Sequence, residues 1–229
     1  MVAAVDHTRN TAVDFAAQAA RVAAGLVRTP EERDAYVQRI IADRVPDLRF
    51  LLDQLLAGAA GDVSRQIDDR RIGLVGWSFG GWAVLAALER DERFRAVVAL
   101  APGGNSKPLP GIIPATLTFA WKREVPTLFL VAERDRFTPL PGMYELFERA
   151  PSSKRMFILN GADHGHFGDV VEDEGGCSLE HAHLFTRGLA LAHLDAALMD
   201  DDPAQRFFAN DPAAQLRARG VDAIAYVPG

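Results

Sequence analysis

The sequence predicts an α/β protein with a mostly parallel, doubly wound sheet and helices on both faces. Short apolar runs of strand length alternate along the chain with longer helix-forming stretches. The apolar runs are continuous rather than alternating with polar residues, which is typical of strands buried on both faces. A length of 229 residues is enough for one such domain with a sizeable core. We therefore expect residues 1–229 to form a single domain.

Local composition predicts each element in turn. The amino end gives a strand and then a loop over residues 6–10. Thr29 is a good helix cap, Pro30 suits the first helical position, and two glutamates follow in the first turn. Leucines on one stripe predict the next helix. In chain order, the predicted strands cover residues 2–5, 72–75, 96–100, 127–131 and 155–159, and the predicted helices cover residues 11–27, 30–44, 47–57, 79–90, 142–149, 179–199 and parts of 203–219.

Residues 103–125 fit neither pattern. Prolines and glycines stand there at irregular spacing among apolar side chains such as Ile112, Leu117 and Trp121. We expect this segment to be a short lid or pocket-lining insertion.

Charge and cysteine usage exclude some classes of function. The formal net charge of −6 argues against a nucleic-acid groove, because phosphate binding requires clustered positive charge. Cys177 is the only cysteine, so no disulfide forms within the chain. No apolar run is long enough to cross a bilayer, and Asp6 and His7 interrupt any signal-like core near the amino end. Localisation and oligomeric state stay open.

The most informative segment is Gly76-Trp77-Ser78-Phe79-Gly80, a G-x-S-x-G pattern. It stands between a predicted strand and a predicted helix. A sharp turn in that position holds a serine in a strained conformation with its hydroxyl exposed, and small flanking residues let strand and helix approach closely. No nucleotide-binding glycine pattern is present. The context therefore favours Ser78 as a nucleophile.

Two further strand ends carry the partners that such a serine needs. Asp135 follows the strand at 127–131, and His164 follows the strand at 155–159. A serine hydroxyl is a poor nucleophile until an imidazole takes its proton, and a buried carboxylate must orient that imidazole. Since parallel strands end at one edge of a sheet, Ser78, Asp135 and His164 are expected to meet there.

Each assignment has a rival. Glu133 competes with Asp135 for the role of the acid that orients the histidine. It stands close to the strand end, which favours Asp135. His166 competes with His164, and otherwise we expect it to be a substrate-side or structural group. Trp77 and Phe137 are candidates to line an acyl pocket.

A metal site is disfavoured. The chain around Cys177 offers several ligand types, including His181, His183, Asp163 and Asp169. However, His181 and His183 are two residues apart in a predicted helix and so face different sides. No H-E-x-x-H or paired-cysteine spacing is present. We expect neither a metal nor another cofactor.

The order serine, aspartate, histidine resembles that of the α/β-hydrolase family. The likeness covers nearly the whole chain. More narrowly, the chain looks like the dienelactone-hydrolase and platelet-activating-factor acetylhydrolase branch. The segments that carry the likeness are Ala4-Val5-Asp6-His7 with Asn10-Thr11, Gly76–Gly80, Asp135 with Pro139, Gly161-Ala162-Asp163-His164, and His164-Gly165-His166-Phe167-Gly168-Asp169 as an H-x-x-F-x-D loop.

The resemblance also implies a gap. Members of this family carry an earlier strand and a glycine-rich loop that supplies one backbone N–H of the oxyanion hole. This chain has no glycine before Gly25 and no His-Gly pair upstream of Ser78. If residues 2–5 are the strand before the serine, edge strands are missing and the chain is a piece of a longer protein. The N–H of Phe79 is then the one oxyanion donor that the sequence identifies.

These residues predict a serine hydrolase that cleaves a carboxylic ester or related small acyl compound through an acyl-enzyme. Two alternatives stay open: acyl transfer to an acceptor other than water, and a catalytically silent scaffold with a binding role. The substrate itself cannot be ranked from the sequence.

Overall fold

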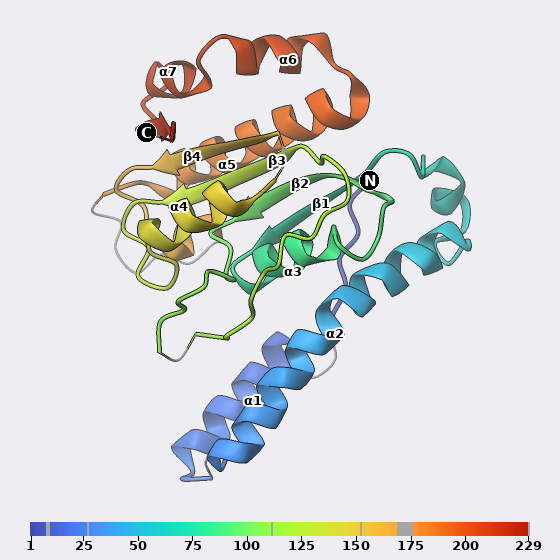
Figure 1. The fold of residues 1–229 in the computed structure, drawn as a ribbon, viewed down its shortest axis with the longest axis vertical. Coiled ribbons are helices and arrows are strands. Elements are labelled where there is room, and N and C mark those ends of the chain that lie inside the picture. Colours follow the sequence, from blue (N-terminus) through green and yellow to red (C-terminus); the bar gives the residue numbers. More distant parts are fainter. Residues whose placement is uncertain (8–9, 27, 111, 152, 169–175, 229) are drawn as a thin grey trace. The chain divides into compact units, whose positions relative to one another are not determined.

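The computed structural model describes residues 1–229 except residues 8–9, 27, 111, 152, 169–175 and 229 (Figure 1). The chain divides into two compact units, Met1–Asp69 and Arg70–Gly229. The described sheet and the predicted catalytic residues all belong to the second unit. That residues 1–229 form a single domain stays a prediction.

The first unit holds the helices α1 (Ala12–Ala23) and α2 (Pro30–Leu56) and the 3-10 turn η1 (Gly61–Gln66). Helix α2 begins as predicted, because the Thr29 hydroxyl accepts the N–H of Glu32 while the Glu32 carboxylate accepts the N–H of Thr29. The predicted break at residues 45–46 is wrong, since α2 continues through Pro46. A proline removes one helical hydrogen bond, and the strong helix formers on both sides carry the helix across it.

The predicted strand at residues 2–5 is also wrong. Residues 1–7 have no regular secondary structure, and Val2 is 96% exposed. A strand is stable only where a neighbour pairs with its backbone, and no strand of the described sheet pairs with this segment. The expectation of missing strands started from residues 2–5 and loses that support.

The second unit is built on a five-stranded sheet in the order β1-β2-β3-β4-β5. The first four strands are parallel, which confirms the mostly parallel sheet, and β5 pairs antiparallel with β4. Nothing in the sequence indicated β5, because three residues are too few for a recognisable pattern. The strands are β1 (Ile72–Trp77), β2 (Phe94–Leu100), β3 (Thr127–Ala132), β4 (Lys154–Leu159) and β5 (Ala223–Ala225).

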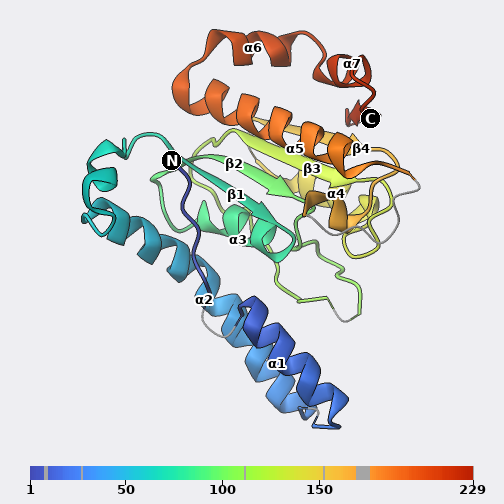
Figure 2. The same ribbon diagram turned by 180° about the vertical axis from the view of Figure 1, so that it is seen from behind.

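Helices cover both faces of this sheet. Helix α3 links β1 to β2 and α4 links β3 to β4, so right-handed crossovers place both on one face. Helix α5 lies on the opposite face: it is behind the sheet in Figure 1 and in front of it in Figure 2, while α4 does the reverse. The bounds are α3 (Phe79–Ala87), α4 (Leu140–Arg149), η2 (His164–Phe167), α5 (Leu179–Leu194), η3 (Asp195–Met199, a π-helical turn), α6 (Asp202–Ala209) and α7 (Pro212–Arg217).

The core fills the space between the sheet and its helices. On the α5 side, Phe185 and Leu189 are fully buried in one cluster with Leu130 of β3. On the other face, Phe129 of β3 meets Phe147 of α4 edge to face, with ring centroids 5.7 Å apart. The two cores fix the strand ends that carry the site.

Residues 103–125 contain no helix or strand among their described positions. They are tied to α3 and α4 at several points. The Trp82 indole N–H donates to the carbonyl of Thr116 (3.0 Å), and Arg149 donates to the carbonyl of Leu117 (2.5 Å). The N–H of Ser106 donates to Glu145 (2.9 Å). These hydrogen bonds hold parts of the segment against α3 and α4. Its role as a short lid or pocket-lining insertion stays a prediction.

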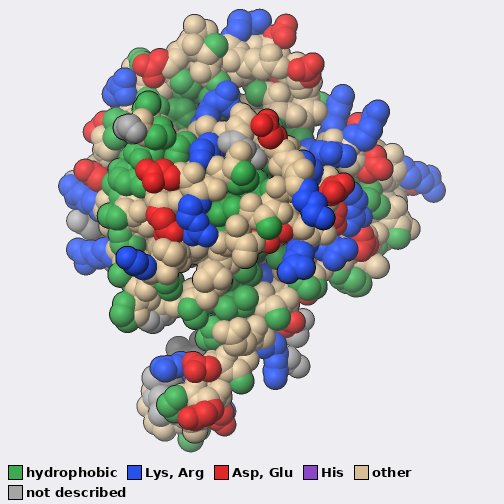
Figure 3. Space-filling model, in the orientation of Figure 1, with side chains coloured by type: hydrophobic (Ala, Val, Ile, Leu, Met, Phe, Trp, Pro, Cys, Tyr) green, Lys and Arg blue, Asp and Glu red, His purple; other side chains and the backbone are tan. Residues whose placement is uncertain are grey.

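On the side of the molecule that Figure 3 draws, basic and acidic side chains are interspersed over the described residues. None of the described helices combines the length and the hydropathy that a membrane span needs.

One buried histidine makes the stability of the second unit depend on pH. His193 of α5 is 1% exposed, and its Nε2 lies 3.2 Å from the carbonyl oxygen of Pro126. Burial lowers the pKa of His193 to about 4. As pH falls from the ordinary histidine value toward about 4, the unfolded chain binds a proton that the folded chain does not, so stability is lost across that window.

We expect His193→Gln to remove this dependence. Between about pH 7 and about pH 4.5 the unaltered chain should lose about 2 kcal/mol more unfolding free energy than the variant. Urea unfolding of both chains at the two pH values measures the difference. Equal losses in the two chains would contradict the role of His193.

Candidate active site

Ser78 occupies a sharp turn between β1 and α3. Its φ of 56° and ψ of −118° lie in a region that side-chain-bearing residues rarely adopt. Three backbone hydrogen bonds hold it there: its N–H donates to Leu100 (2.9 Å), and its carbonyl accepts from Trp82 (3.1 Å) and Gly103 (3.0 Å). The Ser78 side chain makes no capping bond to α3, so its hydroxyl is directed elsewhere.

The two glycines of the G-x-S-x-G pattern differ in how much they are needed. A Cβ at Gly76 would lie 2.2 Å from the carbonyl oxygen of Gly80, which no real side chain tolerates. A Cβ at Gly80 itself would meet nothing within 4 Å. Of these two glycines, only Gly76 is required for the close approach of β1 and α3.

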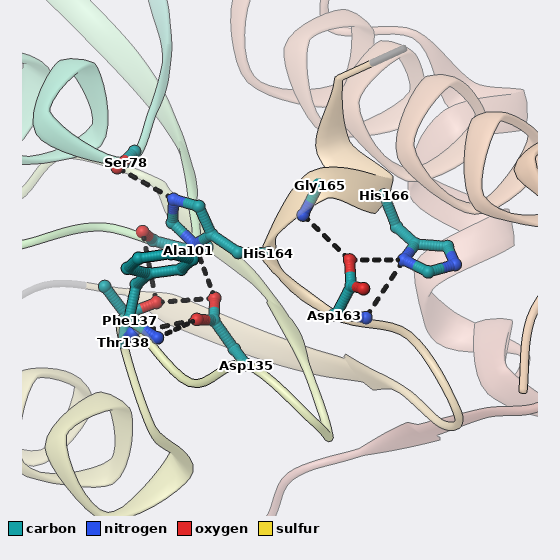
Figure 4. A network of polar contacts seen from close by, with 9 residues as sticks. All are labelled: Ser78, Ala101, Asp135, Phe137, Thr138, Asp163, His164, Gly165 and His166. Atoms are coloured by element: carbon teal, nitrogen blue, oxygen red, sulfur yellow. Dashed lines mark hydrogen bonds and ion pairs between the residues drawn. The ribbon is translucent and has the colours of Figure 1, made fainter. Parts of the chain in front are cut away.

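The structure brings Ser78, His164 and Asp135 together at the carboxyl edge of the parallel strands, as Figure 4 shows. His164 Nε2 lies 2.9 Å from Ser78 Oγ, and His164 Nδ1 lies 2.7 Å from Asp135 Oδ2. The Asp135 side chain is fully buried and that of His164 is 13% exposed. A hydroxyl, an imidazole and a carboxylate are thus connected in one line, which is what proton transfer from the hydroxyl requires.

Four donors surround the Asp135 carboxylate. The N–H groups of Phe137 and Thr138 both donate to Oδ1 at 2.8 Å. His164 and the Thr138 hydroxyl both contact Oδ2, each at 2.7 Å. Burial on its own would raise the pKa of Asp135, but the hydrogen bonds from His164 and Thr138 outweigh it and leave the pKa below its ordinary value. Asp135 therefore stays ionised beside the imidazole.

Two aromatic rings flank the imidazole. The ring centroids of Trp77 and Phe137 each lie 5.2 Å from that of His164. Trp77 is 40% exposed and Phe137 is 47% exposed, so both present apolar surface beside the serine. Their role as substrate contacts stays a prediction.

His166 is placed differently from the substrate-side role that the sequence left open. Its side chain is fully buried and points away from Ser78 (Figure 4). Its Nδ1 lies 2.7 Å from Asp163 and its Nε2 lies 2.9 Å from the carbonyl oxygen of Cys177. With both nitrogens engaged, His166 cannot bind substrate, and it fastens the loop of His164 to the start of α5.

Glu133, the rival acid, has another partner. Its carboxylate accepts the N–H of Gly161 at 2.8 Å. This bond connects the loop after β3, which carries Asp135, to the loop after β4, which carries His164.

Phe79 is the first residue of α3, and its ring stacks on that of Trp82 with ring centroids 5.1 Å apart. Its role as oxyanion donor stays a prediction.

Within the described part of the chain, no three histidine, cysteine or carboxylate side chains gather as metal ligands would. Asp169, named both as a ligand type and as the last position of the H-x-x-F-x-D pattern, lies outside the described residues.

The sequence singled out Asp135 and Pro139 but missed Thr138 between them. A threonine three residues after an aspartate is a local signal, because an aspartate side chain commonly accepts the N–H groups two and three positions on. The hydroxyl contact to the same carboxylate depends on the turn and could not be foreseen.

Gly76→Ala and Gly80→Ala form a matched pair of tests. We expect Gly76→Ala to lower the unfolding free energy by about 3 kcal/mol or more, because its Cβ collides with backbone. Gly80→Ala should be neutral or stabilising, because the helix has room for the methyl group. Urea unfolding of both variants is the measurement. Similar losses in both would contradict the close approach at Gly76.

Comparisons with known proteins identify a family for this chain. Residues 43–173, more than half of the chain and inclusive of Ser78, Asp135 and His164, match the family model described as PET hydrolase-like. The chain is 30% identical over 125 residues to cutinase est1 of Thermobifida alba, covering 53% of this chain and 38% of that protein. It is 28% identical over 131 residues to the platelet-activating factor acetylhydrolase of Canis lupus familiaris, covering 57% of this chain and 26% of that protein. The matches thus span well under half of each relative. With a parallel sheet, a strained serine turn and a matching family model, the chain belongs to the PET hydrolase-like family within the α/β-hydrolases.

Proposed function

We propose that this chain is a serine hydrolase that cleaves a carboxylic ester or related acyl compound through an acyl-enzyme on Ser78. The observation that carries the proposal is the unbroken line of contacts from Ser78 Oγ through His164 to Asp135. The two relatives are a cutinase and an acetylhydrolase, and both names support an acyl substrate.

In the proposed mechanism, Ser78 Oγ attacks the carbonyl carbon while His164 Nε2 takes the hydroxyl proton. Asp135 holds the ring so that Nε2 faces the serine and stabilises the imidazolium that forms. His164 then gives the proton to the leaving alcohol. Water, deprotonated by the same nitrogen, attacks the acyl-enzyme and releases the acid.

The N–H of Phe79 is the proposed oxyanion donor. It stands one residue after the nucleophile at the first position of α3, where the helix dipole is positive. A donor there is suited to stabilise the negative charge that develops on the carbonyl oxygen when Ser78 attacks the carbonyl carbon, as in other serine turns of this type.

Acyl transfer is the second candidate, since the same three residues serve it. The exposure of Trp77 and Phe137 beside His164 leaves the site open to an acceptor other than water. Adding an alcohol acceptor and identifying the products separates the two: a new ester favours transfer, and free acid alone favours hydrolysis.

We expect Ser78→Ala, His164→Gln and Asp135→Asn each to lower kcat for a chromogenic short-chain ester by at least about 10³-fold. Ser153→Ala, at an exposed serine before β4, is the matched control and should keep the rate of the unaltered chain. Steady-state hydrolysis is the measurement. Equal rates for the unaltered chain and Ser78→Ala would remove the hydrolase assignment and favour a silent scaffold.

A further inference from the structure

We propose that Thr138 is a positioning residue for the Asp135–His164 pair. Its hydroxyl orients the carboxylate oxygen that faces the imidazole and limits how strongly that oxygen attracts the imidazole proton. The inference deepens the proposed function and rests on it, because it concerns the same site.

The hydroxyl has one proton and two neighbouring acceptors. Thr138 Oγ1 lies 2.7 Å from Asp135 Oδ2 and 3.4 Å from the carbonyl oxygen of Ala101. The first distance is that of a strong, charge-assisted hydrogen bond, and the second is at the limit of one. The proton therefore goes to Asp135, on the same oxygen that contacts His164.

The two oxygens of Asp135 are held by different means. Oδ1 accepts only backbone N–H groups, which any non-proline residue at position 138 would still supply. Oδ2 is held by two side chains, His164 and Thr138. The hydroxyl can thus be removed without disturbing the backbone half of the arrangement.

Burial makes the hydroxyl hard to replace. Thr138 is 4% exposed and the Asp135 side chain is fully buried, so solvent has little access to a vacated position. Without the donor, negative charge on Oδ2 faces His164 alone, and one of the hydrogen bonds that hold the pKa of Asp135 below its ordinary value is lost. The Asp135 carboxylate also loses one of the contacts that fix its orientation. The orientation of the His164 ring toward Ser78 is then less well fixed.

Thr138→Val removes the hydroxyl and keeps the shape, whereas Thr138→Ser keeps the hydroxyl. We expect Thr138→Val to lower kcat/KM for the chromogenic ester roughly tenfold, mostly through kcat, and to shift the acidic limb of the pH profile upward. Thr138→Ser should restore most of both. Thr127→Val is the structural control: it removes another buried hydroxyl, bonded to the carbonyl of Val125 at 2.8 Å, and should leave the pH profile in place.

A second measurement does not depend on catalysis. In a Ser78→Ala background, the low-field NMR resonance of the His164 Nδ1 proton should move in Thr138→Val and return in Thr138→Ser. An unmoved resonance and pH profile in folded Thr138→Val would overturn the proposal, as would equal losses in the valine and serine variants. If the unaltered chain hydrolyses no ester, the proposed function fails, and the resonance still decides for or against Thr138.

Discussion

The φ of 56° at Ser78 is the constraint on which the site depends. A side-chain-bearing residue in that region costs of order 1–3 kcal/mol, and the surrounding structure must repay it. Here β2 accepts the N–H of Ser78, while α3 and the segment after β2 donate to its carbonyl. These bonds fix the backbone on both sides and so fix the position of the Ser78 Cβ, from which the hydroxyl reaches His164 Nε2 at 2.9 Å. The bare Cα of Gly76 lets the strand and helix close around the turn.

The electrostatics of the site follow from what each carboxylate contacts. Asp135 is buried yet ionised, because hydrogen bonds from four donors replace those that its carboxylate would make to water. Asp163, in the loop that carries His164, instead contacts the Nδ1 of His166. Glu133 ties that loop to the aspartate loop through Gly161. One short loop therefore carries a histidine that faces the serine and a second that holds the loop in place.

The sequence predicted the parallel sheet because continuous apolar runs require burial on both faces. It located the serine turn because the G-x-S-x-G pattern stands between a predicted strand and a predicted helix. It failed where long-range context decides. Residues 2–5 are apolar enough for a strand, but a strand also needs a partner. Pro46 reads as a helix stop, yet its neighbours carry α2 through it. The side on which His166 points depends on Asp163 and Cys177, which no periodicity reveals.

The central claim is that His164 activates the oxygen of Ser78. Treatment with a fluorophosphonate ester, followed by peptide mass mapping, tests it most directly, since the reagent reacts with activated serines. The account predicts one adduct, on Ser78, which His164→Gln abolishes. An adduct on a different serine, or undiminished labelling of Ser78 without the imidazole, would contradict it.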